Sequence, residues 1–140
     1  MPTPKSILTK TKDCGSFKQA VDKLDNKGKG DAFEALCQHF FQINPTYRTK
    51  LKNVWNVNKQ EVPSRIHKKL NLPSPDLGID LLAETNEGEF WAIQCKYHSD
   101  QSKSLTKSEI DSCMNLAFGH CKGISLAVVC TSAEKYSRNL

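Results

Sequence analysis

Three polar side chains near the middle of the chain have types and spacings that suit chemistry with a metal ion. Asp80 lies just before a turn-forming stretch, and Gln94 and Lys96 lie on the apolar run that follows that turn. Because side chains alternate between the two faces of a β-strand, Gln94 and Lys96 share one face. With the Asp80 side chain on that face, a carboxylate, an amide oxygen and an ammonium group would meet. Polar side chains are uncommon on a strand that should cover a core, so a functional role would explain their presence there.

Hydrolysis of a phosphodiester bond supplies such a role. The phosphate repels an attacking hydroxide, so a hard divalent cation has to neutralise charge and activate water. Mg²⁺ takes oxygen ligands, among them one or two carboxylates, and Mn²⁺ is the expected substitute. We expect Asp80, the Gln94 amide oxygen and the Cys95 backbone carbonyl to bind the cation. Lys96 would position or deprotonate the water and stabilise the charged transition state.

The elements that must carry these residues follow from hydrophobic periodicity. Residues 79–83 and 89–97 are predicted to form a β-hairpin around a turn at residues 86–88. A helix is predicted over residues 31–43, with Asp31 as its N-cap after the chain-breaking Gly28 and Gly30, and with its end at Asn44-Pro45.

Four further elements complete the pattern. A short strand is predicted at residues 54–57 and a short basic helix at residues 64–70. A helix over residues 108–118, capped by Thr106 or Ser108, would bury Ile110, Met114 and Ala117. The apolar residues 124–130 read as a buried central strand. Helices alternating with strands predict an α/β layered fold.

The charge distribution suits an enzyme that holds a polyanion and a cation together. Residues 46–70 carry seven basic and one acidic side chain, whereas residues 76–111 carry eight acidic and three basic ones. Basic flanks around an acidic centre fit phosphate binding beside a cation, although charge alone also fits a solvated surface. The basic residues that we expect to contact DNA are Lys50, Lys52, Arg65, Lys68 and Lys69.

Taken together, these residues resemble the PD-(D/E)xK nuclease superfamily, in its Mrr-like branch, where Gln replaces the acidic residue before x-Lys. The matching motifs are Asp80 in Gly-Ile-Asp, Gln94-Cys95-Lys96, and the helix sequence Gly-Asp-Ala-Phe-Glu that ends at Glu34. Residues 76–96 are also similar to the N-terminal nuclease domain of type ISP restriction–modification enzymes and related predicted helicases. The resemblance covers residues 28–132.

The resemblance implies a restriction-endonuclease-like fold, a mixed sheet flanked by helices, and Mg²⁺-dependent endonuclease activity on double-stranded DNA. It adds Glu34 to the catalytic and metal-binding residues. It also implies a longer parent chain with helicase or translocase and methyltransferase domains. In such a chain, residues 28–140 would form the nuclease domain, and residues 1–27 a basic N-terminal segment with a short helix.

Some assignments stay open on the sequence alone. Pro75-Asp76 matches the superfamily name literally, so Asp76 is an alternative metal ligand, although Asp80 adjoins the hairpin directly. Gln38, one helical turn beyond Glu34, and His98, just after Lys96, are accessory candidates. Lys96 could instead be a surface lysine of an edge strand, and Asp80 a turn cap.

Two other functions compete with DNA cleavage. A DNA-binding module without catalysis would explain the basic segments through phosphate neutralisation alone. An RNA nuclease could use the same fold, although nothing in the sequence selects recognition of a 2′-hydroxyl.

The sequence also indicates the cellular location of the protein. No apolar run is long enough to span a bilayer, and the N-terminus lacks the apolar core of a secretory signal. The six cysteines are spread singly among apolar positions, as expected of reduced, buried thiols. We therefore expect a cytoplasmic protein with no membrane partner.

Overall fold

The computed structural model describes residues 20–74, 78–98, 104–132 and 135–136. A four-stranded mixed sheet is its centre, in the order β1-β2-β3-β5. Antiparallel pairing joins β1 to β2 and β2 to β3, whereas β5 runs parallel to β3. The strands are β1 (Leu51–Asn56), β2 (Leu81–Thr85), β3 (Phe90–Lys96) and β5 (Ile124–Thr131). The predicted hairpin is thereby confirmed, and the strand predicted at residues 54–57 overlaps the end of β1, which begins three residues earlier and ends at Asn56.

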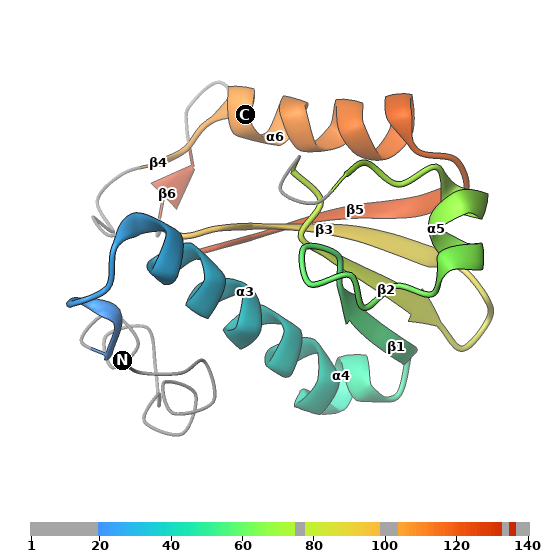
Figure 1. The fold of residues 1–140 in the computed structure, drawn as a ribbon, viewed down its shortest axis with the longest axis horizontal. Coiled ribbons are helices and arrows are strands. Elements are labelled where there is room, and N and C mark those ends of the chain that lie inside the picture. The colour runs from blue at the N-terminus through green and yellow to red at the C-terminus, as the bar shows by residue number, and fades with distance from the viewer. Residues whose placement is uncertain (1–19, 75–77, 99–103, 133–134, 137–140) are drawn as a thin grey trace.

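Helices cover both faces of this sheet (Figure 1). Helix α3 lies along one face, and α6 with the wider turns of η1 lies along the other. Short elements complete the fold, among them a two-stranded parallel pair of β4 with β6. The bounds are α3 (Asn26–Ile43), α4 (Pro45–Arg48), α5 (Ser64–Leu70), β4 (Ser104–Leu105), α6 (Lys107–Met114), η1 (Asn115–His120) and β6 (Lys135–Tyr136). The predicted α/β fold, a mixed sheet flanked by helices, is confirmed.

Strand alternation divides the core into two layers. Leu81 and Ile93 pack with Phe33 and other residues of α3 on one face. Leu82 and Ala92 point to the other face, where they pack with α5 and η1. The backbone between these layers is held rigidly, because close-packed side chains on both faces resist displacement. The ends of the central strands are therefore well suited to hold a site.

Helix α3 begins earlier than the sequence pattern predicts. Its N-cap is Asp25, whose side chain accepts a hydrogen bond of 2.7 Å from the backbone N–H of Gly28. The predicted start at Asp31 was wrong, because the two glycines lie inside the helix once a good cap precedes them. The end at Asn44 is confirmed. The boundary predicted between residues 27 and 28 lies within α3, and the division into two parts stays a prediction.

Two other expectations about packing were wrong. Among the described strands β5 lies at an edge of the sheet and not at its centre, and its Leu126 is 43% exposed. Met114 of α6 was expected to be buried, but it is 44% exposed, and its neighbour Cys113 is buried instead. Of the two predicted caps of α6, Thr106 is confirmed, and it forms a capping box with Glu109. No helix in the described ranges is long and apolar enough to cross a membrane.

Candidate active site

Asp80 lies at the junction of the three antiparallel strands. Its backbone N–H donates to the carbonyl of Ile93 over 3.0 Å, and its carbonyl accepts from the N–H of Val57 over 2.9 Å. These bonds continue the strand pairing by one residue beyond β2. The Asp80 carboxylate is therefore presented from a fixed backbone at the end of the sheet where β3 finishes.

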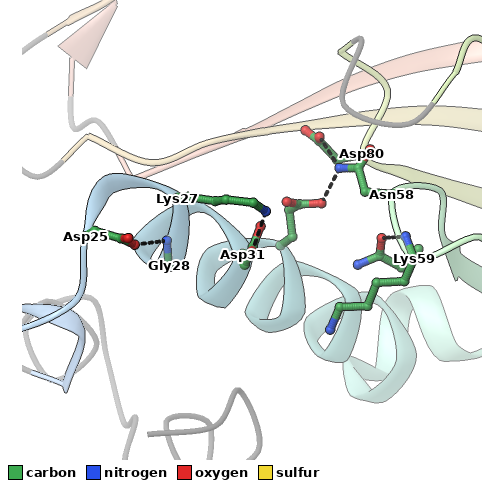
Figure 2. A network of polar contacts seen from close by, with 9 residues as sticks. Asp25, Lys27, Gly28, Asp31, Asn58, Lys59 and Asp80 are labelled. Atoms are coloured by element: carbon green, nitrogen blue, oxygen red, sulfur yellow. Dashed lines mark hydrogen bonds and ion pairs between the residues drawn. The ribbon is translucent and has the colours of Figure 1, made fainter. Parts of the chain in front are cut away.

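The carboxylate of Asp80 is held by two donors from different parts of the chain. Its Oδ2 accepts from the backbone N–H of Cys95 over 2.7 Å, and its Oδ1 accepts from Asn58 Nδ2 over 3.0 Å. Asn58 Nδ2 also donates to Glu34 Oε1 over 2.7 Å. Figure 2 shows Asn58 between α3 and Asp80. The structure thus brings Glu34, Asp80 and Cys95 together, as the sequence predicts, with Asn58 as the link.

Asn58 is presented by a turn that is itself tied at several points. The carboxylate of Glu61 accepts from the backbone N–H of Asn56 over 2.7 Å and from Gln38 Nε2 over 2.9 Å. Gln38 Nε2 also donates to the Val54 carbonyl over 3.0 Å. These bonds of Gln38 brace α3 against β1 and against the turn that carries Asn58.

Gln94 and Lys96 flank Cys95 on β3. Gln94 is 6% exposed, and its Oε1 has no hydrogen-bond partner among the described residues. A Cβ added to Gly78 would lie 3.5 Å from Gln94 Nε2, so the Gln94 amide reaches the segment that leads into Asp80. Gly78 has φ +116, a conformation that other residues rarely adopt, and this lets the chain enter the site so closely.

Lys96 and Asp80 act electrostatically on the same thiol. Burial raises the pKa of Cys113 on α6, the charge of Asp80 raises it further, and the charge of Lys96 lowers it. Lys96 is half-buried, and its backbone carbonyl accepts from the N–H of Ser132 over 3.3 Å. The Lys96 ammonium group and the Asp80 carboxylate are therefore both close enough to Cys113 to influence its ionisation.

These donors fit a hard divalent cation. Two carboxylates, Glu34 and Asp80, converge on one amide, and a buried amide oxygen, Gln94 Oε1, has no partner in the described part of the chain. A cavity of about 90 Å³ opens on the α3 side of this group, lined by Lys27, Asp31, Glu34, Asn56, Asn58 and Lys59. Asp80 and Gln94 do not line it, so the fit to a cation rests on the donor atoms. Mg²⁺ takes one or two carboxylates and further oxygen ligands, and this donor set suits it.

Three thiols lie beneath the carboxylates. Cys95 and Cys130 are neighbours in the β3–β5 pairing, and both interact with Cys37 of α3. The hydrogen bond with Cys37 raises the pKa of Cys130, and burial raises it further. The hydrogen bond with Cys37 lowers the pKa of Cys95, but burial and the Asp80 charge raise it, and the net shift is upward. All three are free thiols, and they are held in the protonated form that is a poor nucleophile.

We therefore predict slow alkylation of this thiol group in the folded protein. A thiol with a raised pKa has less thiolate at pH 8 than an ordinary cysteine. At this pH iodoacetamide should modify Cys37, Cys95 and Cys130 at less than about one tenth of their rates in the unfolded chain. Peptide mass spectrometry of native and urea-unfolded samples gives each rate. Fast labelling of Cys95 in the native protein would contradict the raised pKa of its thiol.

His98, an accessory candidate, contacts residues outside the group formed by Glu34, Asp80 and Cys95. His98 Nε2 lies 3.5 Å from Glu109 Oε2 of α6, and its backbone N–H donates to Ser132 Oγ over 2.7 Å. His98 thereby connects the end of β3 to α6 and β5. Asp76 lies outside the described residues, so its role as an alternative ligand stays a prediction. The contact of Cys95 with Asp80 runs through its N–H, and a role for its carbonyl stays a prediction too.

The basic residues expected to contact DNA gather at the other end of the sheet. Arg65, Lys68 and Lys69 lie on α5, and Lys69 Nζ is 5.7 Å from the ring centre of Phe90, where β3 begins. The Lys50 carbonyl accepts from the N–H of Asn86 in the hairpin turn over 2.9 Å, and Lys52 follows it on β1. The length of β3, about 20 Å at its usual rise per residue, separates this surface from Lys96. Its role in DNA binding stays a prediction.

Asn58 is the functional residue that the sequence did not reveal. Asn is common in turns for reasons of backbone geometry, and the region around it is rich in turn-forming residues. The sequence contains no signal that separates a bridging amide from an ordinary turn amide. Only the fold brings the Asn58 amide between residues that are 24 and 22 positions away.

Comparisons with known proteins agree with the predicted family and fold. A family model named Mrr_cat_2 and described as a restriction endonuclease matches residues 42–140. Among solved structures, the chain is similar to the ATP-dependent type ISP restriction–modification enzyme LlaBIII bound to DNA. That likeness has 22% identity and a TM-score of 0.60 over 99% of this chain, which spans 7% of that enzyme's length. A comparison with curated proteins found no match. Since the family model covers more than half of its residues, the chain belongs to the Mrr-like restriction endonuclease family.

Proposed function

We propose that this chain is a Mg²⁺-dependent endonuclease domain that hydrolyses phosphodiester bonds of double-stranded DNA. The observation that carries the proposal is the meeting of Glu34 and Asp80, from a helix and a strand end, beside the Gln94–Lys96 segment. Membership of a restriction endonuclease family supports it. Mn²⁺ would substitute for Mg²⁺, because it accepts the same oxygen ligands.

Each residue would have a separate part in the reaction. Bound Mg²⁺ supplies charge neutralisation and an activated water. Asp80, Glu34 and the Gln94 amide oxygen would hold the cation, with the Cys95 carbonyl as a further oxygen. Lys96 would orient the attacking water and stabilise the negative charge that develops on the phosphate. The packed layers on both sides of the sheet keep these groups in place during the reaction.

The proposed partners extend beyond this chain. The likeness to a much longer type ISP enzyme, whose structure contains bound DNA, supports a parent protein with helicase or translocase and methyltransferase domains. Residues 28–140 would be its nuclease domain, and residues 1–27 a basic leading segment. A cytoplasmic location follows from such a role, since a restriction system acts on DNA inside the cell.

Supercoiled plasmid provides the test of this function. The protein should nick or linearise plasmid with Mg²⁺ or Mn²⁺ and leave it intact with EDTA. Asp80→Ala should abolish cleavage together with cation binding, whereas Lys96→Ala should abolish cleavage and leave cation binding in place. Cleavage that survives both substitutions, or that proceeds equally in EDTA, would show that the assignment is wrong.

A DNA-binding module without catalysis is the second candidate. The position of Arg65, Lys68 and Lys69 on α5, about 20 Å along β3 from the carboxylates, favours it, because phosphate binding there needs no cation. This alternative predicts salt-dependent DNA binding that Mg²⁺ and Asp80→Ala leave unchanged, with no cleavage under any condition.

A further inference from the structure

A neutral amide links the two carboxylates. Asn58 Nδ2 has two hydrogens, and it donates to Glu34 Oε1 and to Asp80 Oδ1 at 2.7 and 3.0 Å. Glu34 is 8% exposed, so its charge is largely removed from bulk water. Two carboxylates at such a place repel each other unless a positive or hydrogen-bonding group lies between them. The Asn58 amide supplies that group.

The amide lies where a shared cation would have to lie. The two bonds confine Glu34 Oε1 and Asp80 Oδ1 to less than about 6 Å from each other, the range that one donor atom can bridge. A Mg²⁺ ion bound to both oxygens would lie between them, at about 2.1 Å from each. The amide nitrogen and the cation cannot occupy that place together.

The backbone around Asn58 leaves the amide little freedom to drift. The Asn56 side chain accepts from the N–H of Lys59 over 3.0 Å, and the N–H of Asn56 donates to Glu61. The next N–H, that of Gln60, donates to the Val57 carbonyl over 3.0 Å. Rotation of the Asn58 side chain, without movement of the turn, is therefore the simplest way for the amide to leave.

We propose that Asn58 is a positioning residue that holds Glu34 and Asp80 in place of the divalent cation and is displaced when the cation binds both. The proposal rests on the function proposed above. It has a consequence fixed by linkage: contacts made only in the cation-free state oppose cation binding. Removal of the amide should therefore tighten cation binding, although it weakens the protein without cation.

A pair of matched variants tests this inference. Asn58→Ala removes the bridge, and Asn53→Ala removes an amide from β1 that donates to Glu84 over 2.9 Å, away from the site. Mn²⁺ titration followed by electron paramagnetic resonance gives the affinity without any cleavage assay. We expect Asn58→Ala to bind Mn²⁺ about tenfold more tightly than the unmodified protein, which corresponds to about 1.4 kcal/mol. Asn53→Ala should bind it equally.

Thermal unfolding supplies the second readout. In EDTA, Asn58→Ala should melt several degrees below the unmodified protein, and saturating Mg²⁺ should close most of that gap. Asn53→Ala should lower the melting temperature by a smaller amount, and this decrease should be the same in EDTA and in saturating Mg²⁺. If Asn58→Ala does not fold, Asn58→Ser, whose hydroxyl is too short to bridge both carboxylates, takes its place with the same expected direction.

The outcomes separate this inference from the proposed function. Unchanged or weaker Mn²⁺ binding in the Asn58 variants, with binding still lost in Asp80→Ala, would overturn the role of Asn58 and leave the cation site intact. Absence of Mn²⁺ binding to the unmodified protein would overturn both. A gap in melting temperature that Mg²⁺ does not change would show that Asn58 only supports the fold.

Discussion

Asp80→Asn should lower the rate of DNA cleavage by about a thousandfold, a loss typical of removing one essential charged group from a site. The amide has nearly the shape of the carboxylate but no charge to bind a cation. One carboxylate oxygen becomes an NH2 group, which cannot accept the hydrogen bond that this oxygen now receives from the Cys95 N–H or from the Asn58 amide. The unpaired donor should cost about 1–3 kcal/mol of stability. Plasmid cleavage and urea unfolding measure the two effects.

Glu84→Gln is the matched control for that substitution. Glu84 lies toward the other end of β2, where its carboxylate accepts from Asn53 over 2.9 Å. The same exchange of carboxylate for amide there should leave the cleavage rate within about twofold, because the charge lies toward the opposite end of β2 from Asp80, where screening weakens its effect on the site. An equal loss of activity in both variants would point to a general effect on the fold, and Asp80 would lose its assigned role.

Leu82→Ala should reduce the free energy of unfolding by about 3 kcal/mol, within the range for a leucine removed from a packed core. Leu82 is fully buried in the layer that faces α5 and η1. Leu126→Ala on β5 removes the same atoms from a side chain that is 43% exposed, and it should cost less than about 1 kcal/mol. Urea unfolding of the two variants compares these losses. Equal losses would mean that Leu126 is covered in the folded protein.

Local patterns predicted the elements that carry the site. Alternation along β3 placed Gln94 and Lys96 on one face, and the basic helix at residues 64–70 coincides with α5. These predictions succeed because neighbours in the sequence decide them: turn residues delimit the hairpin, and Pro63 fixes the start of α5. The helix that carries Glu34 was also recognised, although not its first turns.

Long-range packing decided the features that the sequence did not show. An apolar run such as residues 124–130 has the same composition at a sheet's centre or edge, so it did not reveal that β5 leaves Leu126 exposed. At the end of α6 the buried face runs through Cys113 and Ala117, and Met114 faces outward. Cys113 and Met114 are both apolar neighbours, so the sequence did not show which of them the sheet covers. The bridge by Asn58 depends on three segments meeting, which no local pattern encodes.

The site's assembly from distant segments has a consequence for newly made protein. The hydrogen bonds that join Glu34, Asn58, Asp80 and Cys95 span 24, 22 and 15 positions of sequence. A chain emerging from the ribosome has all four residues outside only after Cys95 is synthesised and cleared, and even then α3 must dock before the carboxylates meet. Contacts of this range form late in folding. Nascent and misfolded copies would therefore hold no complete set of these four groups, and the site would exist only in the folded domain.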